Sequence, residues 1–488
     1  MGKGAGTVEG IEGLRRTGEF VWVIDRRGEM RVPAVLYASE HLLKKAVADN
    51  ACGQLVNVAC LPGIARYALA MPDIHWGYGA PIGGVGGFSV EEGVVVPGFV
   101  GYDINCGVRL LRTSLSLDEI ASQIDTLMDR LFSNVPSGVG STGCLRVKRK
   151  ELARILEEGA RWAVARGYGG EEDLQAVEAC GCLEGADPSA LSDRAMERGF
   201  EQVGTLGSGN HFLEVQVVEE VYDEATASAF GLMERQIAVM VHTGSRGLGY
   251  QVCDDYLAFF GKVSAKYGIR LPDRQLAAAP ISSPEGKKYL AAMKCAANYA
   301  FANRQVIAEW VRRVFSEVLG RPAERLGMQT VYDVAHNMAR EESHLVDGKK
   351  TALLVHRKGA TRAFAASHPD LPERYRQTGQ PVIIPGTMGT SSYVLVGTQK
   401  AMEETWGSTC HGAGREMSRG EAIRRGRGRR IDRELASQGI VARASKYEGL
   451  AEEMPEAYKD VDEVVRVVEG AGISRKVCRM RPLGVMKG

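Results

Sequence analysis

The chain has 488 residues, of which 44% are hydrophobic and 25% are charged, and its formal net charge at pH 7 is +1. This composition is ordinary for a globular protein and excludes a fibrous or largely disordered chain. No apolar run approaches the roughly 18 residues that a membrane span needs, and residues 1–16 lack the apolar stretch of a secretory signal. We therefore expect a cytoplasmic protein without a membrane partner. Any binding of nucleic acid would have to rest on local basic surface, because the total charge is near zero.

Short apolar segments bounded by Gly, Asn, Asp or Pro predict β-strands along much of the chain. These segments are residues 94–96, 108–112, 212–218, 237–241, 352–355 and 382–384. The 59 glycines gather between such segments instead of forming a linker. This arrangement is typical of backbone that closely approaches a ligand.

Three helical regions alternate with the predicted strands. Ser116-x-x-Glu119 is a capping box that opens an apolar-periodic segment as far as Phe132. Residues 151–166 are amphipathic, and residues 284–319 are predicted to form either one long helix or two.

No internal repeat, low-complexity tract or Pro-rich hinge divides the chain into separate units. We therefore predict a single large α+β domain over residues 1–488, with mixed and antiparallel sheets. The densest basic run, residues 419–433, has two open interpretations, a solvated helix face or a contact with phosphates.

Four of the nine histidines stand out, each with Gly or Asn within two positions: His211, His242, His336 and His411. His211 and His242 also flank the predicted strands 212–218 and 237–241. A rigid sheet can present side chains from such positions to a cleft. Any one of these histidines taken alone would more often be a buried core residue. Their shared setting is what makes them candidates for a site.

Asp103 and Cys106, in Gly101-Tyr-Asp-Ile-Asn-Cys-Gly107, lie between two predicted strands. A thiolate, a carboxylate and several imidazoles suit a divalent transition metal, zinc included, and a thiolate can bridge two ions. The ten cysteines include no CxxC pair of the kind that structural zinc prefers. Dispersed ligands favour a catalytic site with open coordination positions over a structural one.

The local signs of nucleotide binding are weaker. The chain has neither a P-loop nor the K-x-D-G motif of lysine nucleotidyl transferases. Residues 385–392, Pro-Gly-Thr-Met-Gly-Thr-Ser-Ser, suit either a cradle for a base or phosphate or a tight hairpin loop. In His411-Gly-Ala-Gly-Arg415 the glycines admit a phosphate, and a neutral imidazole there can attack phosphorus.

Taken together, an ordered series of motifs over nearly the whole chain resembles the RtcB family of RNA ligases. The motifs are Met71-Pro-Asp-Ile-His-Trp-Gly-Tyr-Gly79, Gly101 to Gly107, Gly207-Ser-Gly-Asn-His211, His242-Thr-Gly-Ser-Arg-Gly247, His336-Asn337, Pro385-Gly-Thr-Met-Gly389, His411-Gly-Ala-Gly414 and Lys487. The resemblance implies one α+β domain with a central cleft for metal and nucleotide. Trp76, Ala80 and Thr387 depart from the residues expected in many members.

The resemblance implies two manganese ions, one held by Cys106, His211 and His242 and the other by Asp103, Cys106 and His336. It assigns the catalytic role to His411, and Arg246 and Arg415 are candidates for RNA phosphates by analogy and charge. The implied contacts with guanine nucleotide are Asn210, His211, Phe212, Leu213, Glu214, His336, Asn337, Pro385, Gly386, Thr387, Met388, Ser392, His411, Gly412, Ala413, Gly414, Tyr458 and Lys487.

The implied chemistry is a ligation of RNA that consumes GTP. A 2',3'-cyclic phosphate is opened to a 3'-phosphate, GMP passes from His411 to that phosphate, and a 5'-hydroxyl attacks the activated end. The RNA would be tRNA halves or broken RNA, so both tRNA splicing and RNA repair stay open. Some relatives use the activator protein archease, and we expect a monomer.

Two other functions remain open at this point. A binuclear metallophosphoesterase acting on RNA ends would use the same ligands but leaves His411 and Lys487 without a role. A metal-stabilised RNA-binding scaffold would need neither an open coordination position nor a nucleotide pocket.

Overall fold

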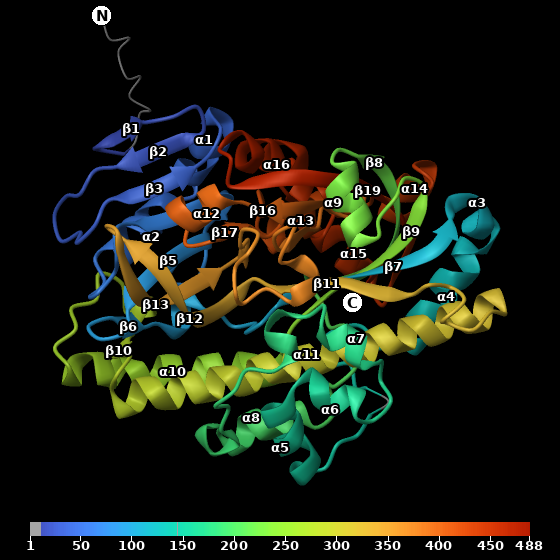
Figure 1. The fold of residues 1–488 in the computed structure, drawn as a ribbon, viewed down its shortest axis with the longest axis horizontal. Coiled ribbons are helices and arrows are strands. Elements are labelled where there is room, and N and C mark those ends of the chain that lie inside the picture. The colour runs from blue at the N-terminus through green and yellow to red at the C-terminus, as the bar shows by residue number, and fades with distance from the viewer. Residues whose placement is uncertain (1–10, 144) are drawn as a thin grey trace, which may run out of the picture.

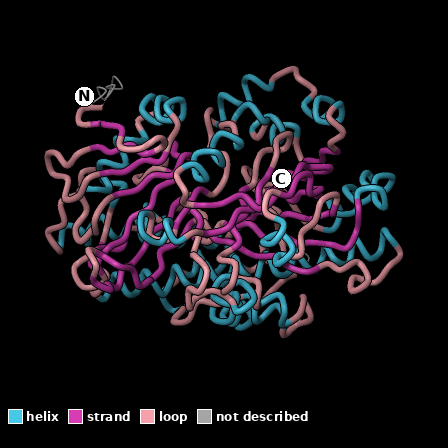
Figure 2. The backbone as a smooth tube through the Cα atoms, turned by 45° about the horizontal axis from the view of Figure 1, so that its top comes forward, coloured by secondary structure: helices cyan, strands magenta, loops and turns pink. Residues whose placement is uncertain are grey.

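The computed structural model describes residues 11–143 and 145–488. The first ten residues of the segment in which we find no secretory signal, and Cys144, lie outside the described residues. Figure 1 shows two large sheets side by side above a layer of long helices, and Figure 2 shows the strands in the interior of the molecule with most helices around them.

The first large sheet has seven strands in the order β1-β2-β3-β4-β5-β13-β12. Neighbouring strands are antiparallel except β3 and β4, which are parallel. Its strands are β1 (Leu14–Arg16), β2 (Val21–Ile24), β3 (Ala34–Tyr37), β4 (Ala68–His75), β5 (Ile82–Ser89), β12 (Asn337–Val346) and β13 (Lys349–Lys358). Two small pairs accompany it: β6 (Val94–Val95) with β10 (Ala279–Pro280), and β14 (Ala360–Arg362) with β17 (Ser408–Cys410).

The second large sheet has eight strands, in the order β11-β7-β9-β8-β19-β16-β15 with β18 also paired to β19. Only the β18–β19 pair is parallel among these neighbours. The strands are β7 (Gly107–Ser116), β8 (Phe212–Val221), β9 (Gln236–Thr243), β11 (Gln329–Ala335), β15 (Pro381–Ile384), β16 (Ser392–Gly397), β18 (Val441–Ala444) and β19 (Ser474–Lys487).

Helices cover both sheets, and the two longest, α10 and α11, run along the lower side of the molecule in Figure 1. The helices are α1 (Glu40–Ala48), α2 (Ala51–Ala59), α3 (Leu117–Ile120), α4 (Ile124–Asn134), α5 (Arg149–Glu158), α6 (Ala160–Val164), α7 (Glu171–Leu174), α8 (Asp193–Gly199), α9 (Glu224–Phe230), α10 (Arg246–Lys266), α11 (Pro284–Leu319), α12 (Gln399–Glu404), α13 (Arg419–Gly426), α14 (Ile431–Ser437), α15 (Tyr447–Glu452) and α16 (Val461–Gly470).

Both faces of the eight-stranded sheet are buried. In β9, Val239 and Val241 join a core cluster that includes residues of α4 and α11, whereas Met240 joins the cluster on the opposite face. This alternation follows from the two-residue period of a strand. It places His242 on the same face as Met240, away from α11.

The predicted strands and helices are present, with two changes. Residues 284–319 form one helix, α11, and Ser116 with Glu119 makes the expected capping box at α3. The two changes are divisions of predicted helices. The segment from Ser116 to Phe132 is divided into α3, a 3-10 turn and α4, and residues 151–166 are divided at Gly159 into α5 and α6. Gly159 has φ +58° and ψ −135°, a conformation that no helix continues through.

The fold class is α+β with mixed sheets, as the sequence predicts. None of the helices within residues 11–143 and 145–488 combines the length and the apolar character that a membrane crossing requires.

Candidate active site

Four expected metal ligands meet because their strands are antiparallel neighbours. Cys106 directly precedes β7, His211 directly precedes β8, His242 is the penultimate residue of β9, and His336 directly follows β11. In the order β11-β7-β9-β8 neighbouring strands run in opposite directions. One edge of the sheet therefore carries the starts of β7 and β8 together with the ends of β9 and β11. The topology therefore gathers residues as distant in sequence as Cys106 and His336.

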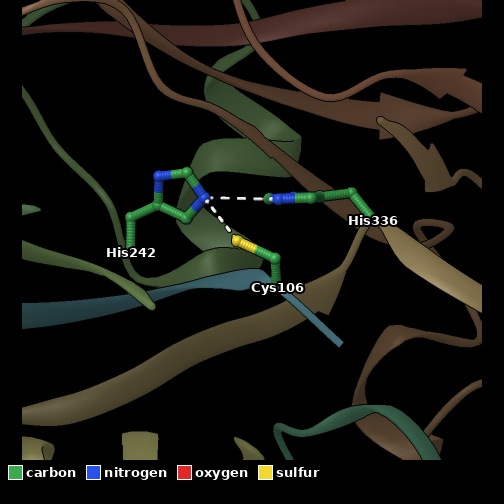
Figure 3. Close-up of side chains that lie close together, drawn as sticks. All are labelled: Cys106, His242 and His336. Carbon is green, nitrogen blue, oxygen red and sulfur yellow. Dashed lines mark hydrogen bonds between the residues drawn. The ribbon is translucent and has the colours of Figure 1, made fainter. Parts of the chain in front are cut away.

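The five expected ligands form one cluster. The Sγ atom of Cys106 lies 3.2 Å from Nε2 of His242 and 3.4 Å from Nε2 of His211. Nε2 of His242 is also 3.2 Å from Nε2 of His336, and Figure 3 shows these donor atoms pointing toward one another. Nε2 of His211 lies 2.7 Å from a carboxylate oxygen of Asp103.

The donor atoms fall into two groups that share Cys106. One is Cys106 with His242 and His336, and the other is Cys106 with Asp103 and His211, each with its donor atoms within 4.8 Å of one another. This grouping differs from the division between two ions that the family resemblance implies, although Cys106 is common to both ions in either arrangement.

The electrostatics of the cluster suit a divalent cation. Burial, reinforced by neighbouring histidines, lowers the pKa of His242 and His336 well below the ordinary range, so both imidazoles are neutral and have lone pairs. Burial and the nearby Asp103 raise the pKa of the Cys106 thiol well above its ordinary value. A bound cation reverses that balance, because a coordinating thiol is deprotonated by the charge of the ion. Converging neutral imidazoles, a carboxylate and a thiol thus fit a transition metal.

A buried ionic network holds the loop that carries Cys106. The Arg304 guanidinium, on α11, donates to both carboxylate oxygens of Asp333 and to the backbone oxygens of Asn105 and Thr243, at 2.8 and 2.9 Å. Asn105 has φ +52°, an unusual conformation that its many contacts fix. The network therefore fixes the loop between residues 103 and 106 against the end of β9.

His411 directly follows β17 and is held by Asp73 of β4. One oxygen of Asp73 lies 2.5 Å from Nδ1 of His411 and accepts the backbone N–H of the same residue at 3.0 Å. Burial disfavours charge on Asp73, but the contacts with His411 and the charge of Lys459 hold the pKa of Asp73 below its ordinary value. An ionised Asp73 requires the proton on Nδ1, so the lone pair of His411 lies on Nε2.

Lys459 joins the segments that carry Asp73 and His411. Its ammonium donates to the backbone oxygens of Pro72 and Ile74, and its backbone N–H donates to Gly414 at 2.9 Å. Burial lowers the pKa of Lys459 to about 8. Gly414 has φ +74°, and a Cβ there would lie 2.3 Å from the backbone oxygen of Asp73, so only glycine allows this approach.

A cavity of about 580 Å³ is lined by four of the five expected metal ligands and by His411. Most of the expected nucleotide contacts line it, together with Asp103, Cys106 and His242 of the metal set. These contacts are Asn210, Phe212, Glu214, His336, Asn337, Pro385, Gly386, Thr387, Met388, His411, Gly412, Ala413, Gly414, Tyr458 and Lys487.

Three expected nucleotide contacts lie behind the cavity wall. Leu213 points to the opposite face of β8, where it packs in the cluster beside α4. Ser392 supports the 385–392 loop by accepting the backbone N–H of Gly386 at 3.0 Å. His211 is directed at Asp103 and Cys106.

The expected RNA contacts are engaged within the protein. Arg415 lines the cavity, but its guanidinium donates to Glu453 at 2.9 Å and to the Tyr458 hydroxyl at 3.1 Å. Arg246 lies 3.0 Å from Nδ1 of His211. In the fully described basic run 419–433, Arg419 alone lines the cavity, and acidic neighbours pair with Arg425, Arg429 and Arg430.

Sequence reasoning gave no role to several residues that build this site. The carboxylate of Glu453 forms ion pairs with both Arg415 and Lys487, and one of its oxygens lies 3.5 Å from Nζ of Lys487. Tyr78, Tyr102, Tyr250 and Lys358 also line the cavity, and Asp73 and Lys459 position its histidine. A carboxylate within an apolar strand was a usable signal for Asp73, because buried charges require a partner. No comparable local sequence pattern distinguishes the three tyrosines from other tyrosines of the chain.

The fold and this cavity place a potential nucleophile beside a group of candidate metal ligands, an arrangement that suits a metal-dependent enzyme. The family model described as tRNA-splicing ligase RtcB matches residues 54–488. Three similar proteins bear the name tRNA-splicing ligase RtcB. The protein from Thermococcus kodakarensis is 56% identical over 97% of this chain and 99% of its own, and that from Archaeoglobus fulgidus is 56% identical over 99% and 100%. The protein from Methanococcus maripaludis is 52% identical over 94% and 95%.

The chain belongs to the RtcB family. This membership confirms the resemblance inferred from the motifs, and it confirms the enzyme class, that of RNA ligases.

Proposed function

We propose that the chain is a GTP- and Mn²⁺-dependent ligase that joins RNA ends bearing a 2',3'-cyclic phosphate or 3'-phosphate to 5'-hydroxyl ends. His411 is the residue that becomes guanylylated, and the RNA passes through an intermediate with GMP on its 3'-phosphate. tRNA halves or broken RNA are the substrates. The whole chain acts as one catalytic domain, since residues from His75 to Lys487 line a single cavity. The cytoplasmic location and the monomeric state stay predictions from the sequence.

One observation carries this proposal: a histidine whose Nδ1 atom is held by a carboxylate shares the cavity with the candidate metal ligands. The rings of His411 and His336 have centroids 4.9 Å apart, and Asp73 holds Nδ1 of His411. Nε2 is therefore the nitrogen free to attack phosphorus. A metallophosphoesterase would need this histidine only as a general acid or base, whereas the ligase needs it as a nucleophile that carries GMP.

Each step of the proposed reaction is assigned to particular residues of the chain. Nε2 of His411 attacks the α-phosphorus of GTP and pyrophosphate leaves, which gives a phosphoramidate. The proton stays on Nδ1 of His411, hydrogen-bonded to the Asp73 carboxylate. The RNA 3'-phosphate displaces His411 from GMP, and the 5'-hydroxyl then displaces GMP from the RNA. Divalent ions held by Cys106 and its neighbours would polarise the phosphoryl oxygens and help to open a cyclic phosphate.

Incubation with GTP labelled in its α-phosphate, in the presence of manganese, tests the proposal. A ligase of this kind retains covalent GMP after denaturation, whereas a phosphoesterase or an RNA-binding scaffold retains none. Absence of labelled protein, with hydrolysis of RNA ends but no joining, would favour the phosphoesterase instead.

We expect manganese to support ligation and zinc to bind but inhibit. The thiolate of Cys106 and the imidazoles attract zinc strongly, while turnover needs ligand positions that exchange. The measurement is ligation by metal-stripped protein supplied with one metal at a time, with metal content determined in parallel. Full ligation with zinc in manganese-free protein would contradict this expectation.

We expect the affinity for GTP to rise with pH through neutrality because of Glu214. Burial raises the pKa of Glu214 to about 7, against the opposing charge of Lys487. Below that pH the carboxyl is neutral, and above it the carboxylate accepts hydrogen bonds from the N1–H and amino groups of guanine. Glu214→Gln should raise the KM for GTP about tenfold and abolish this pH dependence, because a hydrogen bond to a charged group is worth roughly 1.5–3 kcal/mol.

The KM for GTP in adduct formation, measured between pH 6 and 8, checks the role of Glu214. The matched control is Glu219→Gln, because Glu219 is a partly exposed residue of the same strand that pairs with Arg479. A pH profile that Glu214→Gln leaves unchanged would exclude this carboxylate as the titrating group.

A further inference from the structure

Three tyrosines form a continuous aromatic wall of the cavity. The rings of Tyr102 and Tyr250 are stacked, with centroids 4.6 Å apart and planes 27° apart, and Tyr78 meets Tyr102 edge to face at 5.4 Å. All three side chains line the cavity, and Tyr102 is the immediate neighbour of Asp103. The wall therefore reaches from the metal ligands outward.

The wall is also open to solvent. Tyr78 is 37% exposed and Tyr250 is 47% exposed, whereas nucleotide candidates such as Glu214 are almost fully buried. A mononucleotide can be enclosed completely, but a polymer must leave the site along a surface that is open to water. The tyrosines line such a path, and a contiguous exposed patch of large apolar side chains, unlike a single exposed one, commonly marks a binding surface.

The surroundings hold the wall in place and give it positive charge. The buried ammonium of Lys358 donates to the backbone oxygen of Tyr78 at 2.5 Å and to those of Ala80 and Gly98, which fixes the loop that carries Tyr78. Tyr250 lies in the second turn of α10. The Arg198 guanidinium lies 5.7 Å from the ring centroid of Tyr250, where a positive charge suits an RNA phosphate.

The hydroxyls do not suit these residues to acid–base chemistry. Burial raises the pKa of Tyr78 and of Tyr102 above the ordinary value, so both phenols stay neutral at physiological pH. What the wall offers is aromatic surface beside positive charge, which is how proteins bind unpaired bases without regard to sequence.

We propose that Tyr78, Tyr102 and Tyr250 form a stacking wall for unpaired nucleobases of an RNA end entering the cavity. This inference rests on the proposed function, because it assumes that RNA ends are joined there. The bases adjacent to the reacting phosphate lie on the wall and their backbone passes Arg198. A tolerance for any base is the consequence, and a paired end would bind poorly until its last bases separate.

The test compares Tyr250→Leu and Tyr78→Leu with the corresponding Phe variants. Binding of a short single-stranded RNA with a 3'-phosphate is measured by fluorescence anisotropy without GTP, and the KM for the RNA is measured in ligation. Each Leu variant should weaken RNA binding about tenfold or more, the range found when a base loses its aromatic partner. Each Phe variant should restore binding, because it keeps the ring.

The matched control is Tyr267→Leu, which removes a tyrosine of similar exposure at the far end of α10. It should bind RNA as the wild type does. Substrates with an abasic terminal nucleotide on either the 3'-phosphate or the 5'-hydroxyl strand identify the end that stacks. When the missing base is the one that stacks on the wall, the Leu variants and the wild type should bind the RNA with nearly equal affinity.

Different experimental outcomes test the stacking wall and the proposed function. Wild-type RNA affinity in both Leu variants would overturn the stacking wall. A larger rise in the KM for GTP during adduct formation than in the RNA dissociation constant would also overturn it, because the occupant would then be the guanine of GTP. A wild-type protein that binds RNA through the wall but forms no GMP adduct would instead contradict the proposed function.

Discussion

His411→Ala should form no covalent GMP adduct, yet it should still seal RNA that already carries a 3'-guanylylated end. The first step needs the lone pair of Nε2, which the variant lacks. On the activated RNA the task of the nucleophile is complete, and the metal ligands are unchanged. The measurements are retention of labelled GMP by the protein and joining of the pre-activated strand to a 5'-hydroxyl strand.

The wild-type adduct should be labile in acid and persist in alkali. Protonation makes the nitrogen of a phosphoramidate a good leaving group, unlike the oxygen of an ester to Ser or Thr. Treatment of labelled protein across the pH range, followed by measurement of the retained GMP, checks this expectation.

His336→Ala is the contrasting variant, because it removes a proposed metal ligand and should lose both the adduct and the sealing of activated RNA. His356→Ala is a second control, since His356 is buried and accepts the backbone N–H of Val96 at 3.1 Å. Labelled GMP retained by the His411 variant, or a labelled peptide containing His356, would show that another residue is the nucleophile.

Cys106→Ala should lose nearly all bound metal, with ligation falling below detection. Its thiol is the only donor common to the two groups of ligand atoms found in the described residues. Removing it leaves each group with two of its three donors, and incomplete sites bind transition metals weakly. Metal content of the purified variant, measured by elemental analysis, is the direct readout.

The matched control is Cys253→Ala, because Cys253 is buried in α10 and contacts only the backbone oxygen of Pro97 among its hydrogen-bond partners in the described chain. It should keep both its metal and its ligation activity. We expect the same of Cys144→Ala from sequence alone, since that residue lies outside the described part of the structure. Wild-type metal content in the Cys106 variant would disprove thiolate bridging.

Local sequence patterns predict six of the described strands, among them β7, β8 and β9, at whose ends Cys106, His211 and His242 lie. His242 and Cys106 were recognisable because each stands where an apolar run meets small or polar residues. The single helix of residues 284–319 follows from Ser283 as its cap and Gly320 at its end. The family motifs added the expected roles of these residues, which periodicity cannot supply.

Local sequence patterns do not predict contacts between segments that lie far apart in the chain. Asp73 contacts His411 across 338 positions, and the irregular register of β4 against β5 near Asp73 is not encoded in any local pattern. The break at Gly159 was missed because the apolar period continues across it. The aromatic wall depends on three segments that only the tertiary fold brings together.

The position of β19 has a consequence for how the chain is made. This strand, residues 474–487, lies between β8 and β16 in the interior of the eight-stranded sheet. A ribosome must therefore synthesise the chain as far as residue 487 before that sheet can close, and until then β8 has an unpaired edge toward β19. We expect chains that stop before residue 474 to aggregate, and a chaperone that shields strand edges would assist this protein late in translation.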